Sequence, residues 1–378
     1  MRREPALDKS ASALLGRRRL LQFGGLGVAA LGAGGLLAAC GGSSSSSGQG
    51  YGKLAIQLSW IKNIEFAGEY FADAKGYYSQ AGFSGVDLIA GGSAGTSAEA
   101  AVATGKALMG LSSPTVTAPA ILKGAALKTI ASTYQKNPFC ILSIDSNPIP
   151  NVRAMKGKKI GVQAGGNTTI FKGLLNANGM SESDVTIVPV QYDPTVVTTG
   201  EVAGFMAYIT NEPVLLQAKG FKTVSFLFAD SGLPFVAETL VVSQSSIDND
   251  RAKLKALLLA EIKGWTDAIA APAQSATYAV TQYGKDQSLD LNEQTTEAIA
   301  QHGLIVSPDT IKNGIFTLSD SLIEANIKAL AATGVTITAD KLFDFTLLKE
   351  VYQENSGLIS AFATAANSAS ATRTPTGS

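Results

Sequence analysis

The stretch Trp60-Ile61-Lys62-Asn63-Ile64-Glu65-Phe66-Ala67-Gly68-Glu69-Tyr70 joins two segments of different hydrophobic periodicity. Residues 53–58, just before it, form a short apolar run that predicts a β-strand. We expect the stretch itself to be a strand-to-helix loop of an α/β sheet, and ligands of such sheets bind beyond the carboxyl ends of the strands. The helix is indicated by apolar side chains at helical spacing, namely Phe66, Tyr70, Ala74, Tyr77 and Ala81.

The side chains of this loop suit contact with a small molecule. Trp60 offers a flat stacking face, and Asn63 can both donate and accept hydrogen bonds. Glu65 can accept from a ligand N–H group or balance a cation. Structural roles fit equally well, with Trp60 as a core aromatic residue and Asn63 as a helix cap. The residues alone leave both interpretations open.

A family resemblance favours the ligand interpretation. The loop and the segments that follow it, Ala74-Lys75-Gly76-Tyr77-Tyr78 and Ala81-Gly82-Phe83, resemble the opening of the SsuA/THI5-like (NMT1) substrate-binding proteins. Two positions depart from the family pattern: Lys62 replaces the usual Pro, and Phe66 stands where some members carry His. The resemblance extends over roughly residues 53–320.

This resemblance implies an α/β protein with a two-lobed type II periplasmic-binding fold, a mixed sheet in each lobe and two hinge crossings. It also implies a NitT/TauT-type ABC importer, with a small-molecule ligand and with a permease and its ATPase as partners. Such a protein captures its ligand by hinge closure, has no catalytic residue and needs no cofactor. We expect a monomer.

The first 39 residues have the pattern of an export signal, so they are excluded from the fold prediction. Arg17-Arg18-Arg19 is a basic start that resembles a twin-arginine signal, and residues 23–39 are uncharged but shorter than the ~20 residues of a membrane span. Leu37-Ala38-Ala39-Cys40-Gly41 resembles a bacterial lipobox. We expect a lipid on Cys40, a Gly/Ser tether through residue 50, and anchoring on the outer face of the cell membrane or in the periplasm. The alternative is an ordinary signal with a chance cysteine.

Composition limits the remaining classes of function. About 340 residues follow the signal, which favours two lobes over one core. Removing residues 1–39 lowers Lys+Arg from 30 to 24 and Asp+Glu from 30 to 28, so the net charge is about −4 and nucleic acid is not expected as a partner. Cys140 is expected to be a buried apolar residue, and His302 to lie near a helix end. Such a sequence predicts no metal site.

Lobe one is expected to comprise residues 51–145 and 235–355. Its predicted strands are residues 53–58, 87–89, 107–111, 128–133, 139–144 and 238–243. Ser112 and Ser113 follow one strand, and Gln135 follows another, which makes them candidate ligand contacts. Two prolines within residues 145–151 break the pattern, so the first crossing between lobes is predicted there.

Lobe two is expected to comprise residues 146–234, with strands at residues 158–163, 185–190, 204–208 and 224–228. A second crossing is predicted at residues 230–234, and the Ala/Ser/Thr-rich residues 356–378 are predicted to be disordered. Tyr208 and residues 211–213 match a Tyr-x-x-Asn-Glu-Pro signature of a heterocycle-binding subset of the family. Asn167, Thr168 and Asn211 also fit helix capping. The candidate contacts of this lobe are Asn167, Thr168, Tyr192, Asp193, Tyr208, Asn211 and Glu212.

The ligand is predicted from the side chains that these loops carry and lack. After the signal the only arginines are Arg153, Arg251 and Arg373, and none lies in a predicted strand-to-helix loop. Because sulfonate and nitrate are commonly held by Arg, we expect a flat nitrogen heterocycle instead, such as a thiamine-precursor pyrimidine or a flavin. The alternatives are a sulfonate- or nitrate-type anion, a pyrimidine-synthase-like enzyme that uses Lys62 as an amine, and a binding protein that reports to a sensor.

Overall fold

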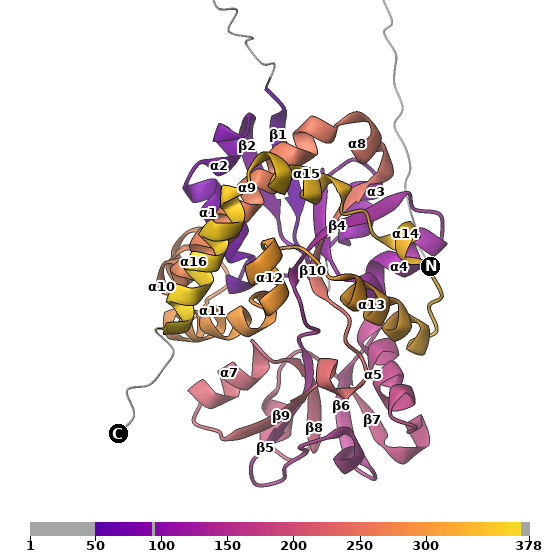
Figure 1. Ribbon diagram of the computed structural model, residues 1–378. Helices are drawn as coiled ribbons and strands as arrows, with labels where there is room; N and C mark the ends of the chain where they lie inside the picture. Colours follow the sequence, from indigo (N-terminus) through magenta and orange to yellow (C-terminus); the bar gives the residue numbers. More distant parts are fainter. Residues whose placement is uncertain (1–49, 93–94, 372–378) are drawn as a thin grey trace, which may run out of the picture. The chain divides into compact units, whose positions relative to one another are not determined.

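The computed structural model describes residues 50–92 and 95–371. The predicted export signal, Cys40 and nearly all of the tether lie outside these residues. Within the described part the strands form two five-stranded mixed sheets, so the predicted α/β class with one mixed sheet in each lobe is confirmed (Figure 1). None of the described helices is long and apolar enough to cross a membrane.

The first sheet has the order β2-β1-β3-β10-β4. β1 (Gly52–Gln57) lies parallel to β2 (Phe83–Ile89) and β3 (Met109–Ser112). β10 (Ala237–Ser243) runs antiparallel between β3 and β4 (Leu127–Tyr134). Buried parallel strands form apolar runs in the sequence, which made β3 and the second half of β1 predictable, whereas the partly exposed β2 was predicted only for residues 87–89.

The second sheet repeats this plan with the order β7-β6-β8-β5-β9. β6 (Lys159–Gln163) lies parallel to β7 (Thr186–Val190) and β8 (Gly204–Tyr208). β5 (Phe139–Ile144) runs antiparallel between β8 and β9 (Thr223–Leu227). Each sheet therefore receives its antiparallel strand directly after a crossing of the chain.

The predicted first crossing at residues 145–151 is wrong, and residues 139–145 belong to lobe two. The chain leaves the first sheet after Tyr134 and pairs in the second sheet from Phe139 onward. A short extended segment suffices for this passage, whereas the prolines lie beyond the far end of β5. The return falls between β9 and β10, the interval that contains the predicted residues 230–234.

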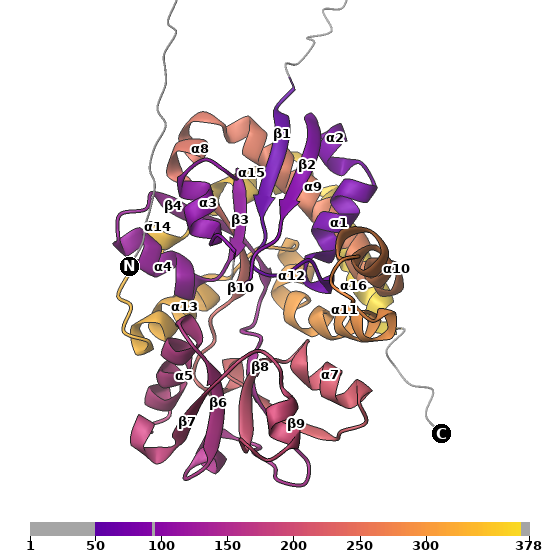
Figure 2. The ribbon, with the colours of Figure 1, turned by 180° about the vertical axis from the view of Figure 1, so that it is seen from behind.

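Helices cover both sheets (Figures 1 and 2). Around the second sheet lie α5 (Gly166–Ala177), α6 (Thr195–Thr198) and α7 (Glu212–Ala218), with short 3-10 turns η2 (Val152–Met155), η3 (Glu182–Asp184) and η4 (Ala229–Ser231). The helices and turns around the first sheet include η1 (Ile64–Phe66), α1 (Ala67–Ala74), α2 (Tyr77–Gln80), α3 (Ala98–Ala103), α4 (Pro114–Leu122) and α8 (Gln244–Asn249). The remainder are α9 (Arg251–Ala270), α10 (Pro272–Tyr278), the π-helical turn η5 (Ala279–Tyr283), α11 (Leu291–Ile305), α12 (Pro308–Asn313), α13 (Asp320–Ala332), α14 (Ala339–Leu342), α15 (Thr346–Glu354) and α16 (Gly357–Ala371).

The prediction that residues 356–378 are disordered is wrong for residues 357–371, which form the helix α16. Phe362 is fully buried in the main hydrophobic core, and Ala365, Ala366 and Ala369 continue the same stripe. Their three- and four-residue spacing is that of one helix face. Low-complexity composition concealed this periodicity.

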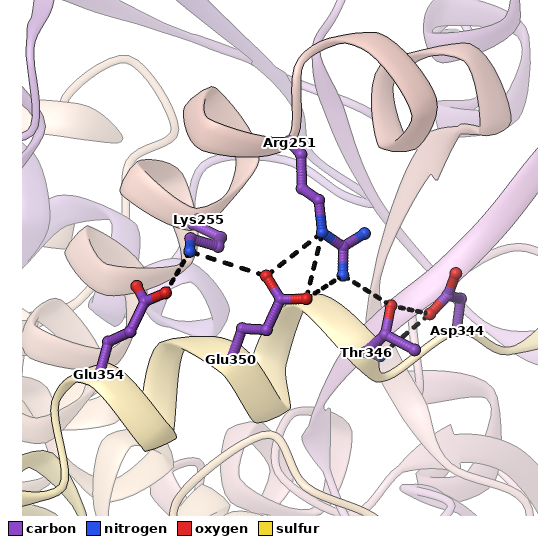
Figure 3. Close-up of polar contacts among 6 residues, drawn as sticks. All are labelled: Arg251, Lys255, Asp344, Thr346, Glu350 and Glu354. Carbon is purple, nitrogen blue, oxygen red and sulfur yellow. Dashed lines mark hydrogen bonds and ion pairs between the residues drawn. The ribbon is translucent and has the colours of Figure 1, made fainter.

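A network of charges ties α15 to the long helix α9 (Figure 3). The guanidinium of Arg251 donates to both carboxylate oxygens of Glu350, and Lys255 pairs with Glu350 and Glu354. The pairs are partly exposed, so their contribution to stability is small beside that of the buried core.

The two crossings touch each other at Asn137. The buried Asn137 side chain donates to the backbone oxygen of Leu233 at 3.1 Å and accepts from the backbone N–H of Phe139 at 2.9 Å. One side chain thus joins the outgoing and the returning segment. This is where a hinge between the two sheets has to bend.

Candidate functional site

A cavity of about 500 Å³ lies where loops of both sheets meet. From the first sheet, its wall includes residues that follow β1 and β3, and from the second it includes residues that follow β6 and β8. The carboxyl ends of these parallel strands face the cavity, as expected for an open α/β sheet. Thr333 and Val335, which follow α13, complete the wall.

Three buried carboxyl groups of the first lobe reach the cavity wall. Glu65, on η1, is 3% exposed, and its Oε2 atom has no hydrogen-bond partner. Glu238, the second residue of β10, has a φ of 47°, a left-handed conformation that is uncommon outside glycine, and accepts from Ser59 at 2.9 Å. Glu99, on α3, accepts from the hydroxyls of Ser112 and Thr117.

A fourth carboxyl group comes from the second lobe. Glu212, in the first turn of α7, accepts from the backbone N–H of Tyr208 at 2.8 Å. Burial, and then the charge of Glu212, raises the pKa of Glu65 to about 7. Burial likewise raises the pKa of Glu212 to about 7. The pKa of Glu238 is raised well above its ordinary value by burial and by Glu65, so these carboxyl groups hold protons near neutral pH.

Aromatic rings from both lobes border the same space. The ring centroids of Trp60 and Tyr192 are 4.9 Å apart, although Trp60 follows β1 and Tyr192 follows β7. Tyr208 packs edge-on against Phe139 at 4.6 Å. The described residues of the cavity wall include no Lys, Arg or His. The cavity therefore combines flat apolar surfaces with acidic groups that are not balanced by cations.

Most of the predicted contacts meet in this cavity. The wall contains Trp60, Glu65, Ser112, Ser113, Asn167, Tyr192, Tyr208, Asn211 and Glu212. They come from the ends of five strands, β1, β3, β6, β7 and β8, and from the connections after them, so the fold brings together residues up to 152 positions apart in the chain. Asn167 also donates to the side chain of Gln163 at 3.1 Å, which places that amide at the cavity.

Four predicted contacts lie outside the cavity wall. The side chain of Asn63 accepts from the backbone N–H of Glu65, and Thr168 donates to the backbone oxygen of Gln163. Gln135 is buried and donates to the backbone oxygen of Ser132. Asp193 accepts from the backbone N–H of Thr195, which lowers its pKa. Each of these four side chains forms a hydrogen bond with a backbone group nearby in the chain.

The polar wall residues that the sequence prediction missed include Glu99, Gln163 and Glu238. Glu238 opens the otherwise apolar strand 238–243, and a carboxylate at such a position is itself a signal of function. Glu99 sits in a run of alanines, where it reads as a solvent-facing helix residue. Lys62, the amine of the enzyme alternative, is absent from the wall.

The remaining titratable candidates are structural. Cys140 is fully buried in β5, and burial raises the pKa of its thiol well above the ordinary value, which confirms its predicted apolar role. His302 lies buried in the last turn of α11, as predicted. Among the described residues, no cluster of three or more His, Cys, Asp or Glu side chains is arranged to hold a metal ion.

Two sheets of matching topology, two crossings and a cavity where they meet define a two-lobed binding protein. The family model described as NMT1/THI5 like matches residues 63–275, more than half of the chain. The chain belongs to this family. The fold that accompanies this family match is the generic periplasmic-binding-protein fold.

Three known proteins illustrate the range of relatives. The riboflavin-binding protein RibY of Chloroflexus aurantiacus is 27% identical over 273 residues, which are 67% of this chain and 76% of RibY. The aliphatic sulphonate-binding protein SsuA of Escherichia coli has a similar structure, with a TM-score of 0.59 and 13% identity over 78% of this chain and 91% of SsuA. The desulfurization enzyme DSZB has a TM-score of 0.55 and 12% identity over 80% of this chain and 99% of that enzyme. The structural likenesses establish the fold alone.

Proposed function

We propose that this protein captures a flat, uncharged nitrogen heterocycle of the flavin type and delivers it to an ABC permease. The observation that carries the proposal is the cavity wall with four glutamates, paired aromatic rings and, among its described residues, no cation. The likeness to a riboflavin-binding protein supports the same ligand class.

The unpartnered oxygen of Glu65 supports a ligand with N–H donors. A buried acceptor without a partner costs about 1–3 kcal/mol, and a ligand N–H group at this point removes that cost. The imide and amide edges of pyrimidine-like rings carry such donors. Trp60 and Tyr192 supply ring faces against which the flat part of the ligand packs.

The same wall disfavours the sulfonate or nitrate alternative. Above about pH 7, where Glu65 and Glu212 are ionised, a bound anion would lie beside two carboxylates, and no Lys or Arg of the described wall would offset the repulsion. The first turns of α4 and α5 offer backbone N–H groups, but helix ends contribute less than an ionised side chain. A sulfonate is therefore the less favoured ligand.

We also propose that the protein binds its ligand without catalysis. A Schiff base on Lys62 would form on a residue that is not part of the cavity wall. Absorbance of a pyridoxal imine that is lost in Lys62→Ala would revive the enzyme alternative. We further propose that the predicted signal exports the protein, that a lipid on Cys40 anchors it, and that it is a monomer. Genes for a permease and an ATPase beside this one would distinguish an importer from a sensor.

The test is a binding panel of matched ligands. Riboflavin and flavin mononucleotide differ by one phosphate group, so the acidic cavity predicts that the purified protein binds riboflavin and rejects the mononucleotide. Quenching of flavin fluorescence measures both affinities, and thermal shift extends the panel to a thiamine-precursor pyrimidine and an alkanesulfonate. Stabilisation by the sulfonate, with no effect of any heterocycle, would overturn the proposal.

A further inference from the structure

A second hollow of about 490 Å³ lies in the first lobe, at the opposite end of β1 from the cavity. The views in Figures 1 and 2 show α3, α8 and the start of β1 together, at the end of this lobe that is far from the second sheet. The hollow is lined by Lys53, Ala55, Val102, Ala103, Gly105, Lys106, Ala107, Leu108, Ser243, Ser245, Ser246 and Lys253.

This hollow is basic, although the chain after the predicted signal is acidic. Its described lining contains three lysines, Lys53, Lys106 and Lys253, and no carboxylate. Lys53 pairs with Asp87 at 3.4 Å, but both side chains are more than half exposed, so the pair is weak. Within the described part of the chain, neither Lys106 nor Lys253 takes part in an ion pair.

Serine hydroxyls lie beside these lysines. The Ser243 hydroxyl accepts from the backbone N–H of Ser246 at 3.1 Å and contacts the hydroxyls of Ser245 and Ser246 at 2.9 Å. Ammonium and hydroxyl donors in one hollow match the oxygens of a phosphodiester, each of which accepts several hydrogen bonds. The hollow thus offers charge and donors to phosphate but little apolar surface to a hydrophobic ligand.

The hollow lies close in sequence to Cys40, and this indicates the source of the phosphate groups that can reach it. Lys53 is the second residue of β1, and only residues 41–52 separate it from Cys40. A chain of twelve residues spans at most about 40 Å. If Cys40 is anchored, head groups of the same membrane lie within reach of Lys53.

We propose that this hollow docks on the head groups of anionic phospholipids. Docking there holds the first lobe on the bilayer by the end opposite the ligand cavity, so the mouth of the cavity stays open to the surrounding solution. Lysines near an anionic surface each strengthen membrane binding by a factor of about five, so three together contribute on the order of a hundredfold. The proposal does not depend on the identity of the captured ligand.

The test uses the chain from Gly41 onward without a lipid, because the buried core residues of the described part of the chain lie between Leu54 and Ala369. Co-sedimentation compares vesicles of phosphatidylcholine alone with vesicles that also contain phosphatidylglycerol. We expect binding only to the second kind, weakened by high salt and reduced on the order of a hundredfold in the triple variant Lys53→Ala, Lys106→Ala, Lys253→Ala.

The matched control is the triple variant Lys75→Ala, Lys222→Ala, Lys312→Ala, which removes the same charge from exposed positions outside the hollow. It should bind anionic vesicles far better than the hollow variant, and unchanged thermal unfolding shows that both variants fold. Equal binding by the two variants, or no binding to anionic vesicles, overturns the proposal. Stabilisation by inorganic phosphate without any vesicle binding would make the hollow a solute site and also overturns it.

Discussion

At the scale of single residues, Glu65 combines deep burial with an oxygen that has no partner. The unfolded chain releases the Glu65 proton near pH 4.5, whereas the folded protein holds it up to about pH 7. The folded state therefore binds more protons in this window, and stability falls as the pH rises through it. This shift of the Glu65 pKa corresponds to about 3 kcal/mol of folding free energy. The ligand-free protein has lost all of it only above pH 7.

Glu65→Gln should therefore stabilise the ligand-free protein at about pH 8 by up to ~3 kcal/mol and leave it unchanged at about pH 4. The same variant should bind riboflavin more weakly, because the amide replaces a carboxylate acceptor. Urea unfolding at both pH values and a flavin titration measure the two effects. Glu201→Gln, at an exposed position without an ion pair, is the control and should change neither. If Glu65→Gln is less stable at both pH values, burial of the ionised Glu65 carboxylate does not destabilise the folded protein.

At the scale of elements, α16 shows how an apolar stripe outweighs composition. It packs along α9, and Phe362 is fully buried between them and the core. Phe362→Ala should cost about 3–5 kcal/mol, the range for a buried Phe that leaves a cavity. Phe221, which is 40% exposed, provides the control, and Phe221→Ala should cost well under half as much. Equal losses in urea unfolding would mean that α16 does not form part of the core.

Removing a charge from the network between α9 and α15 should destabilise the protein much less than Phe362→Ala. Glu350 contacts both Arg251 and Lys255, but the side chains are about a quarter to a third exposed. Glu350→Gln should cost at most about 1 kcal/mol, and the cost should shrink at high salt because exposed ion pairs are screened. A salt-independent loss of several kcal/mol would show that the network is a buried structural element.

Elements were more predictable from sequence than their connections. Each of the ten strands in the described residues overlaps a predicted one, although β2 was predicted only for its last three residues because its first half is partly exposed and polar. The first crossing was misplaced, since the short polar break at residues 135–138 has the pattern of a turn within one sheet, whereas the chain changes sheets there. In the cavity, Trp60, Tyr208 and Glu212 were found because they follow predicted strands. Glu99 and Glu238 were missed because their role depends on which strands become neighbours.

At the scale of the whole described unit, the cavity belongs to neither lobe alone. Trp60 and Glu65 come from the first lobe, whereas Tyr192 and Glu212 come from the second. A ligand that touches both lobes shifts the hinge toward closure only through contacts that the open form lacks. The ring pair Trp60–Tyr192 joins the two lobes beside the cavity, and Asn137 joins the two crossing segments.

Tyr192→Ala should therefore weaken riboflavin binding by roughly three- to tenfold, the equivalent of one aromatic pair, and should leave unfolding of the free protein almost unchanged because Tyr192 is 39% exposed. Flavin titration gives the affinity, and small-angle scattering of free and saturated protein reports closure as a smaller radius of gyration. Tyr51→Ala, which removes a ring packed on Phe83 outside the cavity wall, is the control and should not change the affinity. If saturation with riboflavin leaves the scattering profile unchanged, capture does not proceed by hinge closure.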